Sequence, residues 1–152
     1  MWFEDIEIGS RRELGEYSFS EVEMIAFARK YDPQSFHVDP EAARHSIFGG
    51  LIASGWLTVA VWMKLMIAER ARSGTGDGAP AVSPGFSDLR WHKPVRPGDR
   101  LVYSTEVSAK TELKSRPQFG LVWSRNEARD KDGELVMSFI GKVLLAKKGH
   151  TV

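Results

Sequence analysis

Two side chains in the first third of the chain have the types and the spacing needed for acid–base chemistry. Asp32 and His37 are five residues apart. One of these groups can take a proton from water while the other donates a proton to a substrate, and an imidazole changes its charge near neutral pH. On a helix, side chains five residues apart would point roughly 140° away from each other, whereas irregular backbone after Pro33 can turn both toward one point. We therefore interpret the two residues as a candidate catalytic pair.

A second chemical element lies at the start of an apolar segment, in Ile52-Ala53-Ser54-Gly55-Trp56. Free amides at a helix N-terminus carry partial positive charge, and Gly55 has no side chain to keep a ligand carbonyl oxygen away. A thioester oxygen held there would be stabilised as it becomes enolate-like. Hydration of an α,β-enoyl thioester needs these parts together: a positioned water, a proton donor for the α-carbon and a group that stabilises the enolate.

Each feature also has an ordinary structural explanation. A lone aspartate or histidine in a loop is more often a helix cap or a surface residue, and a glycine near a helix start more often serves backbone geometry. The combination favours catalysis over these explanations.

The composition limits the classes of function. Twenty-one basic and twenty acidic residues leave a formal charge of +1, which gives no overall field to attract nucleic acid or an anionic membrane. The chain has no cysteine, which excludes disulfides, thiolate catalysis and cysteine-based zinc sites and fits a cytoplasmic protein. Residues 1–10 are unlike a signal peptide, and polar residues interrupt the apolar stretch 51–68, which therefore predicts a buried helix rather than a membrane span. We expect no metal, because the other histidines lack partners at metal-ligand spacing.

The N-terminal part predicts a short edge strand followed by a helix. The strand is expected near residues 11–19. Ser20 and Glu23 have the spacing of a capping box, in which each side chain satisfies a free amide of the other. The helix should end at Asp32, because a residue that precedes proline is disfavoured in the α region.

The remaining elements define the expected fold. They are a loop-rich segment at 33–50, a long helix at 51–72, a Gly-rich connector at 73–83 that we expect to be mobile, and strands at 86–92, 101–113, 119–129 and 137–145. One long apolar helix cannot cover itself, and a curved antiparallel sheet wrapped around it solves that problem. The sequence therefore predicts a single α+β domain, residues 1–152, with the layout of a hot-dog fold.

Three segments resemble a known family. Residues 27–43, Phe-Ala-Arg-Lys-Tyr-Asp-Pro-Gln-Ser-Phe-His-Val-Asp-Pro-Glu-Ala-Ala, resemble the signature of the MaoC-like dehydratase and (R)-specific enoyl-CoA hydratase family. Residues 48–55 resemble the approach to that family's central helix, and residues 90–99 resemble its strand-turn-strand region. The similarity spans residues 5–147.

The resemblance implies roles and partners. It implies that Asp32 and His37 hold and activate the catalytic water, and that the Gly55 amide binds the thioester oxygen. It further implies a hot-dog homodimer, or a dimer of dimers, that acts on an acyl-CoA without a metal or redox cofactor. The chain departs from the family pattern at Gln34 and Ser35, where Asn-Pro is usual, at Ser54, where a histidine is frequent, and at Met63, where some members have serine.

Five further residues are candidates for substrate binding. Phe48 and Ser54 flank the approach to the long helix, and Trp56 is expected to line an acyl tunnel or to pack in the core. Arg90 and Lys93 could hold CoA phosphates, since guanidinium and ammonium groups suit them. The alternative for each cation is a solvated position at a strand end.

Two other functions remain open at this point. A hot-dog thioesterase would attack the carbonyl carbon instead of the β-carbon, and such enzymes commonly carry a carboxylate on or near the central helix. The interior of the predicted helix, residues 55–67, contains no acid, which favours a hydratase. The second alternative is a non-catalytic module that binds acyl-CoA without turnover.

Overall fold

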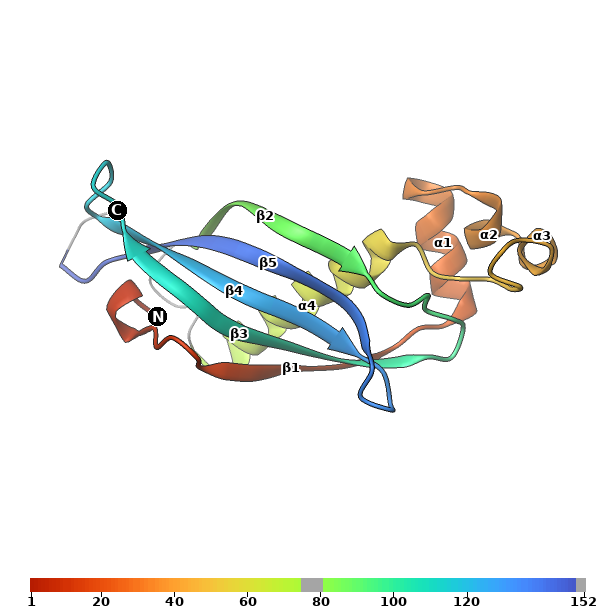
Figure 1. Ribbon diagram of the computed structural model, residues 1–152, viewed down its shortest axis with the longest axis horizontal. Coiled ribbons are helices and arrows are strands. Elements are labelled where there is room, and N and C mark those ends of the chain that lie inside the picture. Colours follow the sequence, from red (N-terminus) through yellow and green to blue (C-terminus); the bar gives the residue numbers. More distant parts are fainter. Residues whose placement is uncertain (75–80, 150–152) are drawn as a thin grey trace.

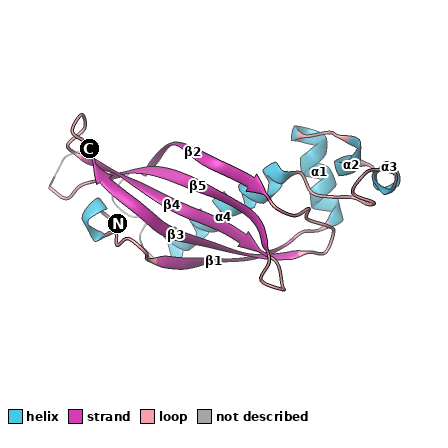
Figure 2. Cartoon of the chain, in the orientation of Figure 1, coloured by secondary structure: helices cyan, strands magenta, loops and turns pink. Residues whose placement is uncertain are grey.

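The computed structural model describes residues 1–74 and 81–149. Its five strands form one antiparallel sheet in the order β1-β3-β4-β5-β2, and one long helix, α4, lies along one face of this sheet (Figures 1 and 2). The elements are η1 Phe3–Asp5, β1 Arg11–Ser18, α1 Glu21–Tyr31, α2 Ser35–Val38, α3 Pro40–Arg44, α4 Gly55–Arg72, β2 Val82–Trp91, β3 Arg100–Glu112, β4 Phe119–Arg129 and β5 Leu135–Ala146. The α+β hot-dog fold predicted from the sequence is confirmed. No helix in the described ranges is long and apolar enough to cross a membrane.

The contact between α4 and the sheet is apolar with two polar anchors. Leu57 and Val61 are buried on the helix side of the core. Tyr103 on β3 donates from its hydroxyl to the carbonyl of Thr58 at 3.0 Å. Trp62 Nε1 donates to Asn126 Oδ1 on β4 at 3.1 Å. Because buried polar groups need specific partners, these bonds set the position of α4 along the sheet.

The start of α4 differs from the prediction. The helix begins at Gly55 rather than near Leu51. The amide of Ile52 donates to Phe36 O at 3.2 Å and that of Ala53 donates to Val95 O at 2.8 Å. These two amides bond to other parts of the chain, so the segment before Gly55 stays extended although its residues would tolerate a helix. The positive end of the helix therefore lies beside α2 and the loop that follows β2.

One of the two hydrogen bonds of the capping box predicted at the start of α1 is confirmed. Ser20 Oγ accepts from the amide of Glu23 at 3.2 Å, as a helix N-cap does. The Glu23 carboxylate does not return to Ser20 in the described bonds; it accepts from Tyr17 Oη at 2.5 Å instead. The tyrosine on β1 thus ties the first turn of α1 to the sheet.

The segment 33–50 was predicted as loop-rich, but it contains two short helices. Asp39 caps α3 by accepting from the amides of Glu41 and Ala42 at 3.0 and 3.2 Å, and Pro40 occupies the first position of that helix. Aspartate at the cap followed by proline is a favourable helix start. The local sequence therefore held a signal for α3.

The boundaries of the strands move by a few residues from the predicted ones. β2 begins at Val82, within the connector predicted at 73–83, and is bulged near Asp88, where φ is 56°. Residues 75–80 of that connector lie outside the described residues.

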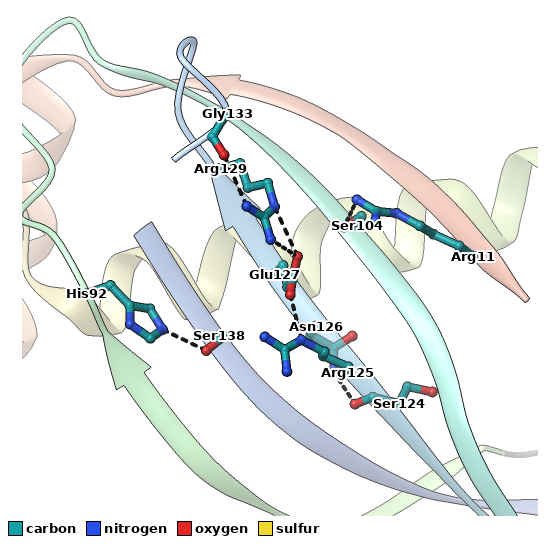
Figure 3. Close-up of polar contacts among 10 residues, drawn as sticks. All are labelled: Arg11, His92, Ser104, Ser124, Arg125, Asn126, Glu127, Arg129, Gly133 and Ser138. Carbon is teal, nitrogen blue, oxygen red and sulfur yellow. Dashed lines mark hydrogen bonds and ion pairs between the residues drawn. The ribbon is translucent and has the colours of Figure 1, made fainter. Parts of the chain in front are cut away.

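The sheet face opposite α4 carries a charged network on β4. Asn126 points toward Trp62 on α4, so its neighbours project from the other face. There the buried Glu127 accepts from Arg125 Nε at 2.5 Å and from Arg129 Nη2 at 2.8 Å (Figure 3). Burial alone would raise the pKa of Glu127, but the two arginines lower it below the usual value. The charged side chains of β4 on this face are paired with one another, so they need no helix to cover them.

Candidate active site

Asp32 stands where α1 ends. Its amide still donates to Ala28 O at 2.8 Å, while its backbone, at φ −153° and ψ 66°, turns the chain away from the helix. Pro33 enforces this turn, because it disfavours the α conformation of the preceding residue. The carboxylate consequently leaves the axis of α1 and faces α2 and the start of α4.

His37 brings its imidazole to the same point from α2. The side chain is buried, with 5% exposure, and Nδ1 lies 2.8 Å from the carbonyl oxygen of Ile52. A carbonyl oxygen only accepts, so Nδ1 carries a hydrogen, and Nε2 is the ring nitrogen that can gain or lose a proton. This Nε2 lies 3.2 Å from Asp32 Oδ2. The pair singled out in the sequence therefore converges.

Both oxygens of Asp32 receive hydrogen bonds. Gln34 Nε2 donates to Oδ1 at 2.7 Å, and Ser54 Oγ donates to Oδ2 at 2.7 Å. Burial would by itself raise the pKa of Asp32, but the bonds from Gln34 and Ser54, together with the charge of His37, lower the pKa below its usual value. The carboxylate is thus ionised at neutral pH.

Gly55 is the first residue of α4, and its amide remains available. The Trp56 amide donates to Ser54 Oγ at 3.3 Å and the Leu57 amide donates to Ser54 O at 3.0 Å. The Gly55 N–H has no acceptor within the described parts of the chain, and Gly55 lines the cavity that holds Asp32 and His37. The arrangement provides one oriented donor at the positive end of a helix.

The space beside the Gly55 α-carbon was expected to admit a ligand, but the indole of Trp91 fills it. A Cβ on Gly55 would lie 2.3 Å from Trp91 Cε2. Trp91 Nε1 donates to Gly55 O at 3.1 Å and to Thr58 Oγ1 at 3.3 Å. The glycine is required by this ring, and its amide is the part that can meet a ligand.

The cavity over the pair has a volume of about 430 Å³. Its walls are largely apolar, and aromatic rings predominate near the acid–base groups. It is lined by Asp32, Gln34, Phe36, His37, Phe48, Ile52, Ala53, Gly55, Trp56, Thr58, Trp91, His92, Lys93, Pro94, Val95 and Val136. The described residues contain no group of three side chains that could bind a metal ion. A partly enclosed apolar cavity with a few convergent polar groups suits a small organic substrate.

Three of the five predicted substrate contacts, Phe48, Trp56 and Lys93, line the cavity, and two of these are aromatic. Phe48 packs on Phe36 with ring centroids 5.2 Å apart. Trp56 packs edge-to-face on Trp91 at 5.3 Å. Both aromatic side chains lie beside Asp32 and His37 in the lining of this cavity.

The structure gives Ser54, Lys93 and Arg90 other contacts. Ser54 is fully buried, and its hydroxyl donates a hydrogen bond to the Asp32 carboxylate. It therefore holds this carboxylate in position. Lys93 lines the cavity, but its ammonium group is bound by Asp130 and by Glu134, and these bonds raise its pKa. Arg90 pairs in register with Ser138 on β5 and lines neither the cavity over Asp32 and His37 nor the apolar cavity between α4 and the sheet.

The position of Arg90 follows from the pairing of the strands. Ser138 lies opposite Glu127 on β4, on the face away from α4, and its Oγ bonds to His92 Nε2 at 2.8 Å (Figure 3). Arg90, beside Ser138, shares this outer face. Arg90 therefore lies outside the lining of the cavity that holds Asp32 and His37.

The sequence did not lead us to predict the contact of Trp91 with Gly55 or the hydrogen bond from Gln34 to Asp32. Gln34 had been noted as a departure from the family pattern, and its amide donates to Asp32. The two-residue spacing of Gln34 and Asp32 was a usable signal. The contact of Trp91 with Gly55 joins residues 36 apart in sequence, and no local pattern marks it.

Comparisons with known proteins agree on the kind of domain. A family model described as "MaoC like domain" matches residues 5–122. The chain is 36% identical to a solved MaoC-like dehydratase from Rhodospirillum rubrum, with a TM-score of 0.85 over 99% of each chain. It is 31% identical over 141 residues to the uncharacterized protein YdeM of Bacillus subtilis (strain 168), which covers 89% of this chain and 96% of the relative. The fold is shared with an (R)-hydratase from A. caviae, at 24% identity and a TM-score of 0.71 over 91% of this chain and 96% of that one.

Proposed function

Because this chain belongs to the MaoC-like domain family, we propose that it is a hydratase or dehydratase of acyl-CoA thioesters. It adds water to an enoyl-CoA, giving the (R)-3-hydroxyacyl product, or removes water in the reverse direction. The observation that carries the proposal is the 3.2 Å approach of His37 Nε2 to Asp32 Oδ2, with Nδ1 of the imidazole held by Ile52 O. The names of the relatives, a MaoC-like dehydratase and an (R)-hydratase, support this reaction class.

The proposed mechanism assigns different tasks to the two groups. Asp32, held ionised, accepts a hydrogen bond from the water and orients it. The lone pair of His37 Nε2 takes a proton from this water as its oxygen bonds to the β-carbon. The imidazolium, next to the Asp32 carboxylate, then returns that proton to the α-carbon. One water is consumed, and H and OH are added across the double bond.

The Gly55 amide is proposed to bind the thioester oxygen. Negative charge develops on this oxygen when the β-carbon is attacked, and a donor fixed in advance stabilises it without reorganising. Phe36, Phe48 and Trp56 exclude bulk water from the cavity, which strengthens the hydrogen bond from the amide. No metal or redox cofactor takes part in this scheme, and CoA enters only as part of the substrate.

A crotonyl-CoA assay tests the proposal directly. Loss of the enoyl absorbance is followed beside a free-thiol assay on the same sample. We expect loss of the enoyl group without release of thiol. Thiol release with the enoyl group retained would instead establish a thioesterase.

The thioesterase alternative has little support from α4. The first acid along the helix is Glu69, near its C-terminal end, and Arg12 holds it at 2.7 Å. A carboxylate there cannot direct water at a thioester bound beside Gly55.

A non-catalytic binding module is the second alternative. It predicts ligand binding with no turnover and no effect of replacing His37.

We also propose that the active form is a homodimer, or a dimer of dimers, in which two copies meet through β2 and α4. β2 is an edge strand of the sheet, and an edge strand can pair with a second chain. Large apolar side chains are exposed along these two elements: Trp56, Met63, Ile67, Val82, Phe86 and Trp91. Four of them, Trp56, Met63, Ile67 and Phe86, line a second apolar cavity of about 490 Å³ between α4 and the sheet. A second copy laid against this surface would cover it.

A further inference from the structure

We propose that Ser54 is a positioning residue that joins Asp32, the carboxylate that orients the water, to the first turn of α4, which carries the Gly55 oxyanion donor, and that it does more than cap α4. This inference rests on the proposed hydratase function. Ser54 precedes Gly55 directly and hydrogen-bonds to Asp32, 22 residues earlier in the chain. Its side chain contacts both the Asp32 carboxylate and the Trp56 amide in the first turn of α4.

The direction of the Ser54 hydroxyl is determined by its two partners. The Trp56 amide can only donate, so at 3.3 Å it points to a lone pair of Oγ. The Asp32 carboxylate can only accept, so at 2.7 Å it receives the one hydroxyl hydrogen. The hydroxyl therefore has one arrangement in which both contacts are hydrogen bonds.

The backbone around Ser54 is held as firmly as its side chain. The preceding amide, of Ala53, donates to Val95 O at 2.8 Å, and Ser54 O accepts from the Leu57 amide at 3.0 Å. A displacement of Ser54 would break these bonds. Because this backbone is fixed, the Ser54 hydroxyl holds Asp32 Oδ2 at a fixed position relative to the first turn of α4.

The two donors to Asp32 differ in their surroundings. Gln34 is exposed, whereas Ser54 has 0% exposure. A hydrogen bond to a charged group is stronger where water is excluded. Ser54 is therefore the donor that dominates the orientation of the carboxylate, and Oδ2, which it contacts, is the oxygen that faces His37.

A purely structural role for Ser54 would resemble that of Ser20. Ser20 caps α1 by accepting from the Glu23 amide at 3.2 Å, and its hydroxyl has no contact with Asp32. Loss of either cap should lower stability by a similar amount. Only the loss of Ser54 should change the behaviour of the carboxylate. Ser20→Ala is therefore a matched control for Ser54→Ala.

The experiment compares wild type, Ser54→Ala, Ser54→Thr and Ser20→Ala. Each is assayed for hydration of crotonyl-CoA across pH, and the titration of the Asp32 side-chain carboxyl is followed by carbon NMR without substrate, assigned through Asp32→Asn. For Ser54→Ala we expect kcat to fall about tenfold or more, since hydrogen bonds to charged groups are of this strength. KM should change little, because the hydroxyl is turned toward Asp32 and away from the substrate. The NMR midpoint of Asp32 should move to higher pH.

Ser54→Thr keeps a hydroxyl and should restore most of kcat and the wild-type midpoint, while Ser20→Ala should leave both unchanged. An unchanged midpoint in Ser54→Ala, or an equal change in Ser20→Ala, would overturn the inference. The NMR arm separates it from the proposed function. If wild type hydrates no enoyl-CoA but the midpoint still rises in Ser54→Ala alone, the positioning of Asp32 by Ser54 stands and the hydratase assignment fails.

Discussion

The indole ring of Trp91 occupies the volume that a side chain on Gly55 would need. Its Cε2 atom lies 2.3 Å from the position of a Cβ on Gly55, and its Nε1 donates to the carbonyl of the same glycine. A strand from one part of the chain thus determines that the first residue of α4 has no side chain. The same packing leaves the Gly55 amide facing the cavity.

Gly55→Ala should therefore destabilise the protein although alanine favours helices. The added methyl group must displace the Trp91 ring, and overpacking of this kind costs about 1–3 kcal/mol. Urea denaturation followed by tryptophan fluorescence measures the change. A double variant with Trp91→Val, which removes the ring, should lose less stability than the sum of the single variants. Additive effects would contradict the steric explanation.

Replacing either member of the acid–base pair should abolish most of the turnover. We expect Asp32→Ala and His37→Ala each to reduce hydration of enoyl-CoA by about 10²–10⁴-fold, the usual contribution of such groups. His45→Ala, which removes an exposed histidine from the following segment, is the control and should leave the rate unchanged. Thermal denaturation of each variant checks that the fold is retained. Full activity in either variant of the pair would refute the assignment.

The lowered pKa of Asp32 predicts a pH-dependent contribution to stability. The fold holds this carboxyl ionised, so the native state binds fewer protons than the unfolded chain does. The stabilisation is present above the ordinary pKa of 3.8 and is lost as the pH falls through the lower, folded value.

Asp32→Asn lacks this contribution. The free energy of unfolding of wild type relative to Asp32→Asn, measured in urea, should therefore decrease between about pH 6 and about pH 3. Contributions of other carboxyl groups cancel in this difference. A difference that is independent of pH would show that the carboxylate is not held ionised by the fold.

The proposed dimer can be tested at the edge strand. Light scattering should give twice the chain mass of 17.0 kDa. Phe86→Arg places a charge on the exposed apolar surface of β2 and should shift the mass toward that of one chain. Ile47→Arg is the control, because Ile47 is 96% exposed but lies outside β2 and α4. If both variants keep the wild-type mass, the two copies do not meet through this surface.

Lys93 offers a test of how the CoA moiety is held. Its ammonium group is bound by Asp130 and Glu134, so it is not available for a phosphate. Lys93→Gln should leave KM for enoyl-CoA within about twofold of wild type, since exposed ion pairs contribute little. A large increase in KM would show that the ammonium group leaves its partners to bind the substrate.

Local patterns in the sequence were sufficient for the main elements and for the catalytic pair. The apolar residues of α4, the cap at Ser20 and the break at Asp32-Pro33 act over a few residues. The strands predicted at 101–113, 119–129 and 137–145 agree with β3, β4 and β5 to within two residues at each end. Asp32 and His37 are joined by a short tight segment, so their convergence could be anticipated from spacing alone.

The tertiary structure decided where α4 begins and what surrounds the pair. The segment before Gly55 could have been helical, but Phe36 and Val95 accept its amide hydrogens. Ser54 had been expected to contact substrate, and it contacts Asp32 because α1 and α4 meet there. Arg90 was placed outside the site by the register of β2 against β5. Hydrogen-bond partners 15 to 37 residues apart depend on how whole elements pack, and packing depends on every contact in the fold, so no short stretch of sequence specifies them.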